Sequence, residues 1–272
     1  MRIFGDVLGL DEGDQAELGL ALNLRETRDR DFGSSLLAYT SMEDKRVLVI
    51  GCSDGIGLAT ARRLVDSGWN VTGISRRESP LSGAGYVHLV ADVASDDYPA
   101  SLTAIAKERG PFDACIYCAG IAESFDVERI ECDERVIAVN LTGALRTARI
   151  VLPPMVAAGR GHLVVLSSQA DELVSNVVPS YTASKAALSA YFEGVGLALR
   201  AKGVAVTNLR FGFVDTKMAR AKVKPFQISV DKSAEIVERC LAKQPLRLTR
   251  PLRMAVLVAI FRLLQRWRVR LA

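Results

Sequence analysis

The sequence is poor in the residues that build metal and redox centres. It has 2 histidines, His88 and His162, and 5 cysteines without the spacing of a disulfide framework, which is typical of a reducing compartment. Cys115 and Cys118 form a C-x-x-C pair, but positions three apart on a strand point to opposite faces of a sheet. The pair therefore indicates packing cysteines rather than a metal or redox site.

Long apolar runs and targeting signals are also missing. No stretch reaches the roughly 18 uninterrupted apolar residues of a membrane span. Acidic residues interrupt the first apolar stretch from Asp6 onward, which argues against a secretory signal peptide. The net charge is only +4, and no basic patch interleaved with aromatic residues accompanies it. The sequence therefore predicts a cytoplasmic chain that does not bind nucleic acid.

From Lys45 onward, short apolar runs alternate with segments of helical spacing. Runs typical of buried parallel strands are Val47–Ile50, Val71–Ile74, Val87–Val90, Ala114–Tyr117, Leu163–Leu166 and Val204–Leu209. Helical spacing covers Gly57–Asp66, Tyr98–Arg109, Asp133–Ala158, Tyr181–Ala201 and Asp231–Ala242. This alternation predicts one α/β domain over 45–250, a single doubly wound parallel sheet of the Rossmann type with helices on both faces. Residues 1–44 are polar with little periodicity and are predicted to be a flexible N-terminal extension.

The first predicted strand leads directly into a glycine-rich segment, which a helix follows. Gly51 would turn the chain out of the strand, Gly55 would let the backbone approach a pyrophosphate, and Gly57 would let helix and strand pack closely. The helix N-terminus would offer free N–H groups to the phosphates. The charge of Asp54 is unfavourable there. The residues predicted to contact a dinucleotide in this loop are Gly51, Ser53, Asp54, Gly55, Ile56 and Gly57.

The end of the second strand predicts which dinucleotide binds. An acidic residue there would bind the ribose hydroxyls of NAD, whereas this chain has Ser75, Arg76 and Arg77. Two guanidinium groups suit a 2′-phosphate, so they favour NADP(H) over NAD(H). The alternative is that both arginines are solvated loop residues that bind no cofactor. Asp92, after the third strand, is placed either to accept a hydrogen bond from an adenine amino group or to cap its own loop.

Tyr181 and Lys185 are four residues apart on a predicted helix and so share one face. A tyrosine hydroxyl titrates near pH ~10, so it needs a nearby cation to transfer protons at neutral pH. Lys185 would supply that charge and also bind the nicotinamide ribose. Ser168, which ends the preceding strand, would hold a substrate carbonyl oxygen. Its neighbour Ser167 would face the other side of the strand.

In this order and spacing, the motifs resemble the short-chain dehydrogenase/reductase family. The match runs from about Lys45 to at least Lys243 and includes Gly51-x-x-x-Gly55-Ile56-Gly57, Asp92-Val93, Cys118-Ala119-Gly120, Asn140, Ser167-Ser168 and Tyr181-x-x-x-Lys185. The resemblance implies that Ser168, Tyr181 and Lys185 form a catalytic triad. It also implies that Asn140 holds a helix kink and a water that links Lys185 to solvent. Further cofactor-binding residues that it implies are Asp92, Val93, Cys118, Ala119, Gly120, Tyr181, Lys185, Gly212, Val214 and Thr216.

The chain departs from the family pattern at two positions. Cys118 stands where the family has Asn, which puts stability in doubt more than activity. Phe211 replaces the proline of the Pro-Gly turn that cradles the nicotinamide, so we expect altered loop rigidity with binding retained through Val214 and Thr216.

The segment Lys217–Ser229, which would form the substrate lid, is short. It contains Lys217, Arg220, Lys222 and Lys224 and predicts an open cleft with a basic rim. This basic rim is compatible with an anionic substrate or with a partly membrane-embedded one. The alternative is that the basic side chains of the loop are merely solvated and bind no substrate.

The segment 251–272 is predicted to form a basic amphipathic helix. Its apolar stripe is Leu252, Val256, Ile260, Leu264, Trp267 and Leu271, and Arg262, Arg266 and Arg270 line another face. Such a helix fits an anionic membrane surface, but it also fits packing on its own domain or on a partner subunit. The family resemblance implies a homodimer or homotetramer through the helices Asp133–Ala158 and Tyr181–Ala201.

Together, the motifs predict an NADPH-dependent oxidoreductase that reduces a small-molecule ketone or aldehyde to an alcohol, with Tyr181 as general acid. A non-catalytic NADPH-binding regulator is the alternative, although it predicts a broken triad. A sugar-nucleotide epimerase or dehydratase would need a larger substrate domain than the about 60 residues after Gly212 provide.

Overall fold

The computed structural model describes residues 45–219 and 223–271, so the predicted extension 1–44 lies outside the described residues. In chain order the strands are β1 (Arg46–Ile50), β2 (Asn70–Ser75), β3 (Tyr86–Val90), β4 (Ala114–Tyr117), β5 (Gly161–Ser168), β6 (Val204–Phe211) and β7 (Arg247–Arg250). The helices are α3 (Gly55–Asp66), α4 (Tyr98–Arg109), α5 (Glu131–Ile137), α6 (Gly143–Ala158), α7 (Pro179–Leu199), α8 (Val230–Lys243) and α9 (Leu252–Leu271). Shorter helical turns are η2 (Val127–Arg129), η3 (Ala138–Thr142), η4 (Gln169–Glu172) and η5 (Arg200–Lys202).

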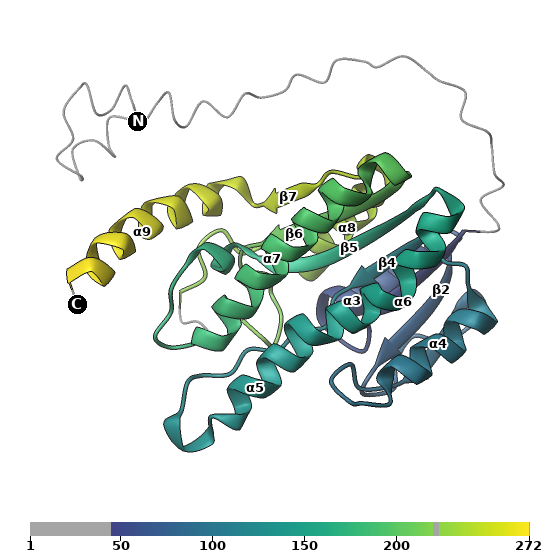
Figure 1. The fold of residues 1–272 in the computed structure, drawn as a ribbon, viewed down its shortest axis with the longest axis horizontal. Coiled ribbons are helices and arrows are strands. Elements are labelled where there is room, and N and C mark those ends of the chain that lie inside the picture. Colours follow the sequence, from purple (N-terminus) through teal and green to yellow (C-terminus); the bar gives the residue numbers. More distant parts are fainter. Residues whose placement is uncertain (1–44, 220–222, 272) are drawn as a thin grey trace, which may run out of the picture. The chain divides into compact units, whose positions relative to one another are not determined.

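The strands form one parallel sheet in the order β3-β2-β1-β4-β5-β6-β7 (Figure 1). The direction in which strands are added reverses between β1 and β4, which confirms the predicted doubly wound α/β sheet. In such a sheet, ligands bind at the carboxyl ends of the strands next to the reversal. The topology therefore places the functional site before any side chain is considered.

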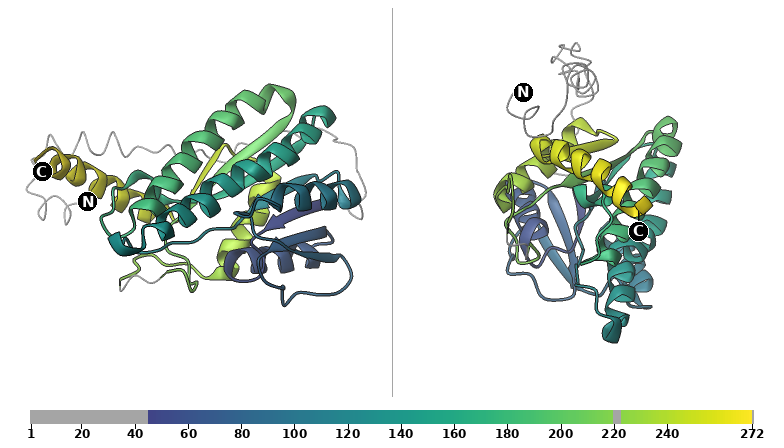
Figure 2. Two further views of the ribbon diagram at one scale, coloured as in Figure 1. Left: turned by 60° about the horizontal axis from the view of Figure 1, so that its bottom comes forward. Right: turned by 90° about the vertical axis from the view of Figure 1, so that its left-hand side faces the viewer.

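Helices cover both faces of the sheet (Figure 2). On one face, α4, α6 and α7 contribute Leu102, Val151 and Phe192 to the core. On the other face, α3 and α8 contribute Leu64 and Val237. This arrangement explains why the central strands are almost uniformly apolar, since a strand buried on both faces has no solvent side.

Cys115 and Cys118 pack into different layers. Cys115 lies in the core beneath α4, α6 and α7, whereas Cys118 packs against the core beneath α3 and α8. The prediction that the two thiols point to opposite faces is confirmed. Burial raises the pKa of both thiols, as expected for packing cysteines.

Two elements differ from the sequence prediction. The strand β7 was not predicted, because its short sequence carries Arg247 and Arg250 instead of an apolar run. Within the described residues it pairs with β6 alone, at the sheet edge, where charged residues are common. The predicted helix Asp133–Ala158 begins at Glu131 and contains the π-helical turn η3 around Asn140. A π turn bends a helix, so the kink that the resemblance implied has a structural counterpart.

The helical stretch Glu131–Ala158 is long and apolar enough, by length and composition alone, to cross a membrane. Its residues Ala144, Ala148, Val151 and Met155 are buried against the sheet. Packing on the sheet therefore accounts for the apolar character of this stretch.

Helix α9 follows β7 and extends along the outside of the molecule (Figure 1). The first part of the predicted apolar stripe faces solvent, since Leu252 is 52% and Val256 is 36% exposed. A different side of the helix packs on the domain, where Val258 is 2% exposed. The predicted apolar stripe also includes Leu264, Trp267 and Leu271, and the predicted basic face includes Arg266 and Arg270. The side chains of these five residues are outside the part that the structure describes.

Candidate active site

Two adjoining clefts open at the carboxyl ends of the strands. The smaller, of about 300 Å³, runs from the glycine loop after β1 to the end of β2. The larger, of about 660 Å³, lies between the end of β5, the start of α7 and the start of α9. Ile56, Cys118, Gly120, Thr216 and Met218 line both, so the two clefts form one continuous site.

The glycine loop has the backbone geometry that its sequence predicts. Gly51 has φ +86° and its N–H donates to Ile74 O (2.7 Å), which turns the chain out of β1. A Cβ on Gly57 would lie 2.1 Å from Gly51 O, so only glycine permits this helix–strand contact. Gly55 has φ +55° and begins α3. The loop therefore leaves a cradle at a helix N-terminus, which fits a pyrophosphate.

Asp54 caps the helix that follows the loop. Its Oδ1 accepts from Gly55 N (2.8 Å), and its Oδ2 accepts from Lys217 Nζ (2.8 Å). The hydrogen bond from Lys217 holds the pKa of Asp54 below its usual range. The charge that looked unfavourable near a phosphate is therefore paired. Lys217, which the sequence places on a basic rim, is this partner.

The end of β2 positions two arginines on the smaller cleft. Arg76 and Arg77 are exposed and line it. Ser75 is buried, and its Oγ donates to Arg77 O (2.8 Å) and contacts His88 Nε2 (3.2 Å). Ser75 therefore shapes the turn that carries the arginines, and it lines the smaller cleft beside them.

Asp92 caps its own loop, the alternative that the sequence left open. Its Oδ1 accepts from Ala94 N (3.0 Å), and its Oδ2 pairs with Arg135. Burial raises the pKa of this carboxyl, but these hydrogen bonds outweigh it and lower the pKa overall. Asp92 and Val93 still line the smaller cleft.

Ser168, Tyr181 and Lys185 meet at the larger cleft. Burial raises the pKa of Tyr181, and a hydrogen bond with Ser168 partly opposes this. Lys185 is 5% exposed, and its Nζ donates to Leu166 O (2.8 Å) and lies 5.8 Å from the centroid of the Tyr181 ring. Burial lowers the pKa of Lys185 to about 8. At neutral pH the site therefore holds a protonated tyrosine beside a mainly cationic lysine.

Asn140 lies behind this group and lines neither cleft. Its Nδ2 donates to Ile121 O (2.9 Å) and Ser184 Oγ (2.9 Å), and its Oδ1 accepts from Ile121 N (2.8 Å). A Cβ on Gly120 would lie 3.4 Å from Asn140 Oδ1 and 3.5 Å from Lys185 Nζ. Asn140 therefore ties η3 to α7 and to the loop after β4, close to the lysine.

The turn after β6 is held by sheet pairing. Phe211, in place of the family's proline, is the buried last residue of β6 and pairs with Arg250. Gly212 N donates to Arg250 O (2.9 Å), so β7 supports the turn. Val214 and Thr216, which are predicted to contact the nicotinamide, line the larger cleft. Of the predicted basic rim, Arg220 and Lys222 lie outside the described residues.

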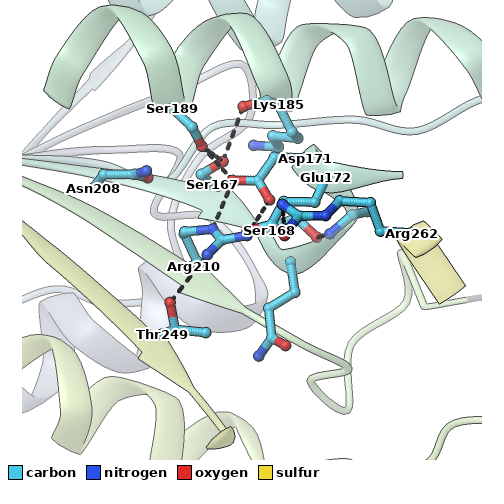
Figure 3. A network of polar contacts seen from close by, with 12 residues as sticks. Ser167, Ser168, Asp171, Glu172, Lys185, Ser189, Asn208, Arg210, Thr249 and Arg262 are labelled. Carbon is cyan, nitrogen blue, oxygen red and sulfur yellow. Dashed lines mark hydrogen bonds and ion pairs between the residues drawn. The ribbon is translucent and has the colours of Figure 1, made fainter. Parts of the chain in front are cut away.

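A buried ion pair lies behind the end of β5 (Figure 3) and was not predicted. The Arg210 guanidinium on β6 donates to Asp171 of η4, from Nε to Oδ2 (2.7 Å) and from Nη2 to Oδ1 (2.5 Å). The two side chains are 6% and 3% exposed. Burial lowers the pKa of Arg210, but its hydrogen bonds to Asp171 outweigh this and raise it. The sequence does contain one indication of this pair. Arg210 directly follows the apolar run Val204–Leu209, and an arginine in a buried strand needs a partner because buried arginines are rare unless paired.

Further contacts bind the segment after Ser168 to its surroundings (Figure 3). Glu172 accepts from Arg210 (2.6 Å) and from Arg262 of α9 (2.9 Å). Gln169 Nε2 donates to the carbonyl groups of Arg250 (2.9 Å) and Pro251 (3.1 Å). The turn η4 is thereby fixed to β6 and to the beginning of α9.

A chain of hydroxyl groups connects the same network to α7. Ser189 Oγ donates to Asp171 Oδ2 (2.5 Å) and is hydrogen-bonded to Ser167 Oγ (2.7 Å). Ser167 Oγ also donates to Lys185 O (3.2 Å). Ser167 therefore faces α7 and contacts the backbone of the lysine.

The parallel sheet, the glycine cradle and the serine–tyrosine–lysine group together define an oxidoreductase of the dinucleotide-binding α/β class. The family model for short chain dehydrogenases matches residues 45–226. The chain belongs to this family.

Similarity to individual proteins agrees with this. An uncharacterized oxidoreductase of Staphylococcus saprophyticus is 31% identical over 208 residues, which cover 69% of this chain and 89% of that protein. A short-chain dehydrogenase structure from Streptomyces avermitilis has a TM-score of 0.71 at 23% identity, covering 84% of this chain and 95% of that one. A variant of actinorhodin polyketide ketoreductase, solved with NADPH, has a TM-score of 0.68 at 24% identity, covering 77% and 97%. At this level of identity the two structures show a shared fold.

Proposed function

We propose that this chain reduces a ketone or aldehyde to an alcohol with NADPH, and that Tyr181 donates the proton. The observation that carries the proposal is that Ser168, Tyr181 and Lys185 line one cleft, with Lys185 Nζ 5.8 Å from the centroid of the Tyr181 ring, and that this cleft is continuous with the glycine cradle. The group provides a proton donor and a hydroxyl that can bind an oxygen.

The protonation states of the group suit reduction. Tyr181 keeps its proton at neutral pH, since burial raises its pKa, and is therefore available as a general acid. Ser168 would hold the substrate oxygen within reach of that proton. Lys185, mainly cationic below its pKa of about 8, would stabilise the phenolate that remains.

The residues of the smaller cleft fit a dinucleotide. Gly51, Gly55 and Gly57 leave the backbone open beside the α3 N-terminus, where pyrophosphate would bind. Arg76 and Arg77 would bind a 2′-phosphate, and no carboxylate ends β2 to favour NAD. When bound, the nicotinamide would supply the hydride. The proposed cofactor is therefore NADP(H), with NAD(H) as the weaker ligand.

The test is NADPH oxidation with uncharged ketones, compared between the native chain, Tyr181→Phe and Tyr191→Phe. Removing the general acid should lower kcat by about 10²–10⁴-fold and leave NADPH affinity unchanged. Tyr191 is on the same helix but 50% exposed, so its phenylalanine variant should keep full turnover. Turnover that persists in Tyr181→Phe would remove Tyr181 from the mechanism. A regulator that only binds NADPH would turn over no ketone in any of the three forms.

Contact with a membrane surface is a further proposal for α9. Its support is the exposed apolar side chains of Leu252, Phe261 and Leu263, together with the arginines of residues 247–270. Co-sedimentation with anionic vesicles should fall when Phe261 and Leu263 are changed to serine, and equal partitioning would refute the proposal. A homodimer or homotetramer through Asp133–Ala158 and Tyr181–Ala201 stays a prediction.

A further inference from the structure

Among the described residues, the lining of the larger cleft is almost free of charge. Of the residues that line it, Lys185 alone carries a charged side chain within the described part of the chain, and its Nζ is already hydrogen-bonded to Leu166 O (2.8 Å). Lys217 belongs to the predicted basic rim, yet it does not line this cleft and is paired with Asp54. A carboxylate or phosphate drawn into the cleft would therefore lose its hydration and find only the Lys185 ammonium among the described charged groups to replace it, which is costly.

The lining of this cleft combines hydroxyl groups with apolar side chains. Ser168 and Tyr181 line it where β5 ends and α7 begins. The apolar lining includes Val177 and Met218, which are 58% and 42% exposed. A substrate with an apolar body would cover these side chains and remove their surface from water.

Helix α9 supplies part of the apolar lining. Met254 and Val258 line the cleft, and a Cβ on Gly212 would lie 3.0 Å from Met254 Cγ. The helix is held at both ends of this section. Gln169 binds the backbone at its start, and the Arg262–Glu172 ion pair (2.9 Å) holds it one turn beyond Val258 (Figure 3).

We propose that the cleft takes an uncharged carbonyl compound with an extended apolar body, and that Met254 and Val258 of α9 form the wall that selects for this body. The inference rests on the proposed function, because it names the substrate class of the same site. It favours an uncharged substrate over the anionic one that the sequence left open.

The experiment uses the full chain, NADPH and the series 2-butanone, 2-hexanone, 2-octanone and 2-decanone. Each added methylene should raise kcat/KM about three- to fourfold while the cleft accommodates it, given the transfer free energy of a CH₂ group. In a second arm, 7-oxooctanoate should be reduced at least tenfold less efficiently than 2-octanone. A flat series, or preference for the keto acid, would overturn the inference.

Two valines of α9 give a matched pair of variants. Val258→Thr keeps the shape of a side chain that is 2% exposed and lines the cleft, whereas Val256→Thr makes the same change at a side chain that is 36% exposed. We expect Val258→Thr to lower kcat/KM for 2-decanone about tenfold with little effect on 2-butanone, and Val256→Thr to affect neither. Equal behaviour of the two variants, or a loss uniform along the series, would contradict the wall assigned to α9.

The outcomes separate this inference from the proposed function. If 2-butanone is reduced but chain length has no effect, the proposed function stands and the inference fails. If no ketone is reduced, the proposed function fails, and calorimetric titration of 2-butanol and 2-decanol into the native chain with NADPH still tests the cleft. Tighter binding of 2-decanol supports the apolar wall, and equal or absent binding overturns it.

Discussion

The two sides of the candidate site are built in different ways. On the nucleotide side, the backbone makes the shape, through the glycines between β1 and α3 and their contact with each other. On the substrate side, pairs of side chains far apart in sequence hold the walls. Asp171 and Arg210 are 39 residues apart, and Glu172 and Arg262 are 90 apart. The glycine loop of the nucleotide side is therefore a local structure, joined to the rest of the chain by the Asp54–Lys217 pair, while the walls of the substrate side depend on the completed fold.

The largest effect should come from breaking the buried pair on the substrate side. Arg210→Met leaves the nearly buried carboxylate of Asp171 without its guanidinium partner. Breaking a buried pair from one side costs about 3–5 kcal/mol, and urea unfolding at pH 7 would measure the loss. NADPH affinity at low temperature should be retained, because the glycine cradle contains neither residue.

Two further variants define what the pair contributes. Adding Asp171→Asn to Arg210→Met should recover part of the stability, since the buried charge is then gone. Arg63→Ala removes a pair with Glu238 at the surface and should leave the unfolding curve almost unchanged. A loss from Arg210→Met as small as that from Arg63→Ala would mean that the buried pair is not what holds the substrate side.

A second effect is expected where the two sides meet, at Lys185. Its pKa is about 8 in the folded chain and about 10.5 when unfolded. Between these values the unfolded chain binds more protons, so this group makes the free energy of unfolding rise with pH. Relative to Lys185→Met, the native chain should gain about 2 kcal/mol between pH 8 and pH 10. Unfolding curves of both forms across this range would test the sign, and a difference that stays constant would show that Lys185 is not desolvated.

The smallest effect should come from the nucleotide side. Gly57→Ala places a Cβ against Gly51 O, so the loop must shift. The affinity for NADPH should then fall by at least about tenfold, which corresponds to about 1.4 kcal/mol of binding free energy. Gly194→Ala on α7 is the matched control, since nothing lies within 4 Å of its added Cβ. It should leave NADPH affinity unchanged and stabilise the helix by up to about 1 kcal/mol. Equal affinities of the two variants in a fluorescence titration would show that the loop does not form the cradle.

The difference between local and long-range contacts also explains which features of the site the sequence could predict. The glycine loop, the β2 arginines and the Tyr181–Lys185 spacing are short patterns whose geometry follows from one turn or one helix face, and the structure brings these residues together. The Asp171–Arg210 pair was not predictable in this way, because nothing local to η4 indicates that β6 will lie beside it. Strand β7 was missed for a related reason. An edge strand needs no continuous apolar run, so its pattern resembles that of a loop.

The ion pair between Arg262 and Glu172 has a consequence for the conditions of any kinetic measurement. Its side chains are 42% and 26% exposed, so dissolved salt reaches it, and a Debye length of about 8 Å at physiological ionic strength already weakens such a pair. The Asp171–Arg210 pair is shielded from the solvent ions. Ionic strength therefore acts on α9 while the rest of the network stays fixed. Long ketones, whose bodies depend on the Met254 and Val258 wall, should show a salt-dependent KM that short ketones lack.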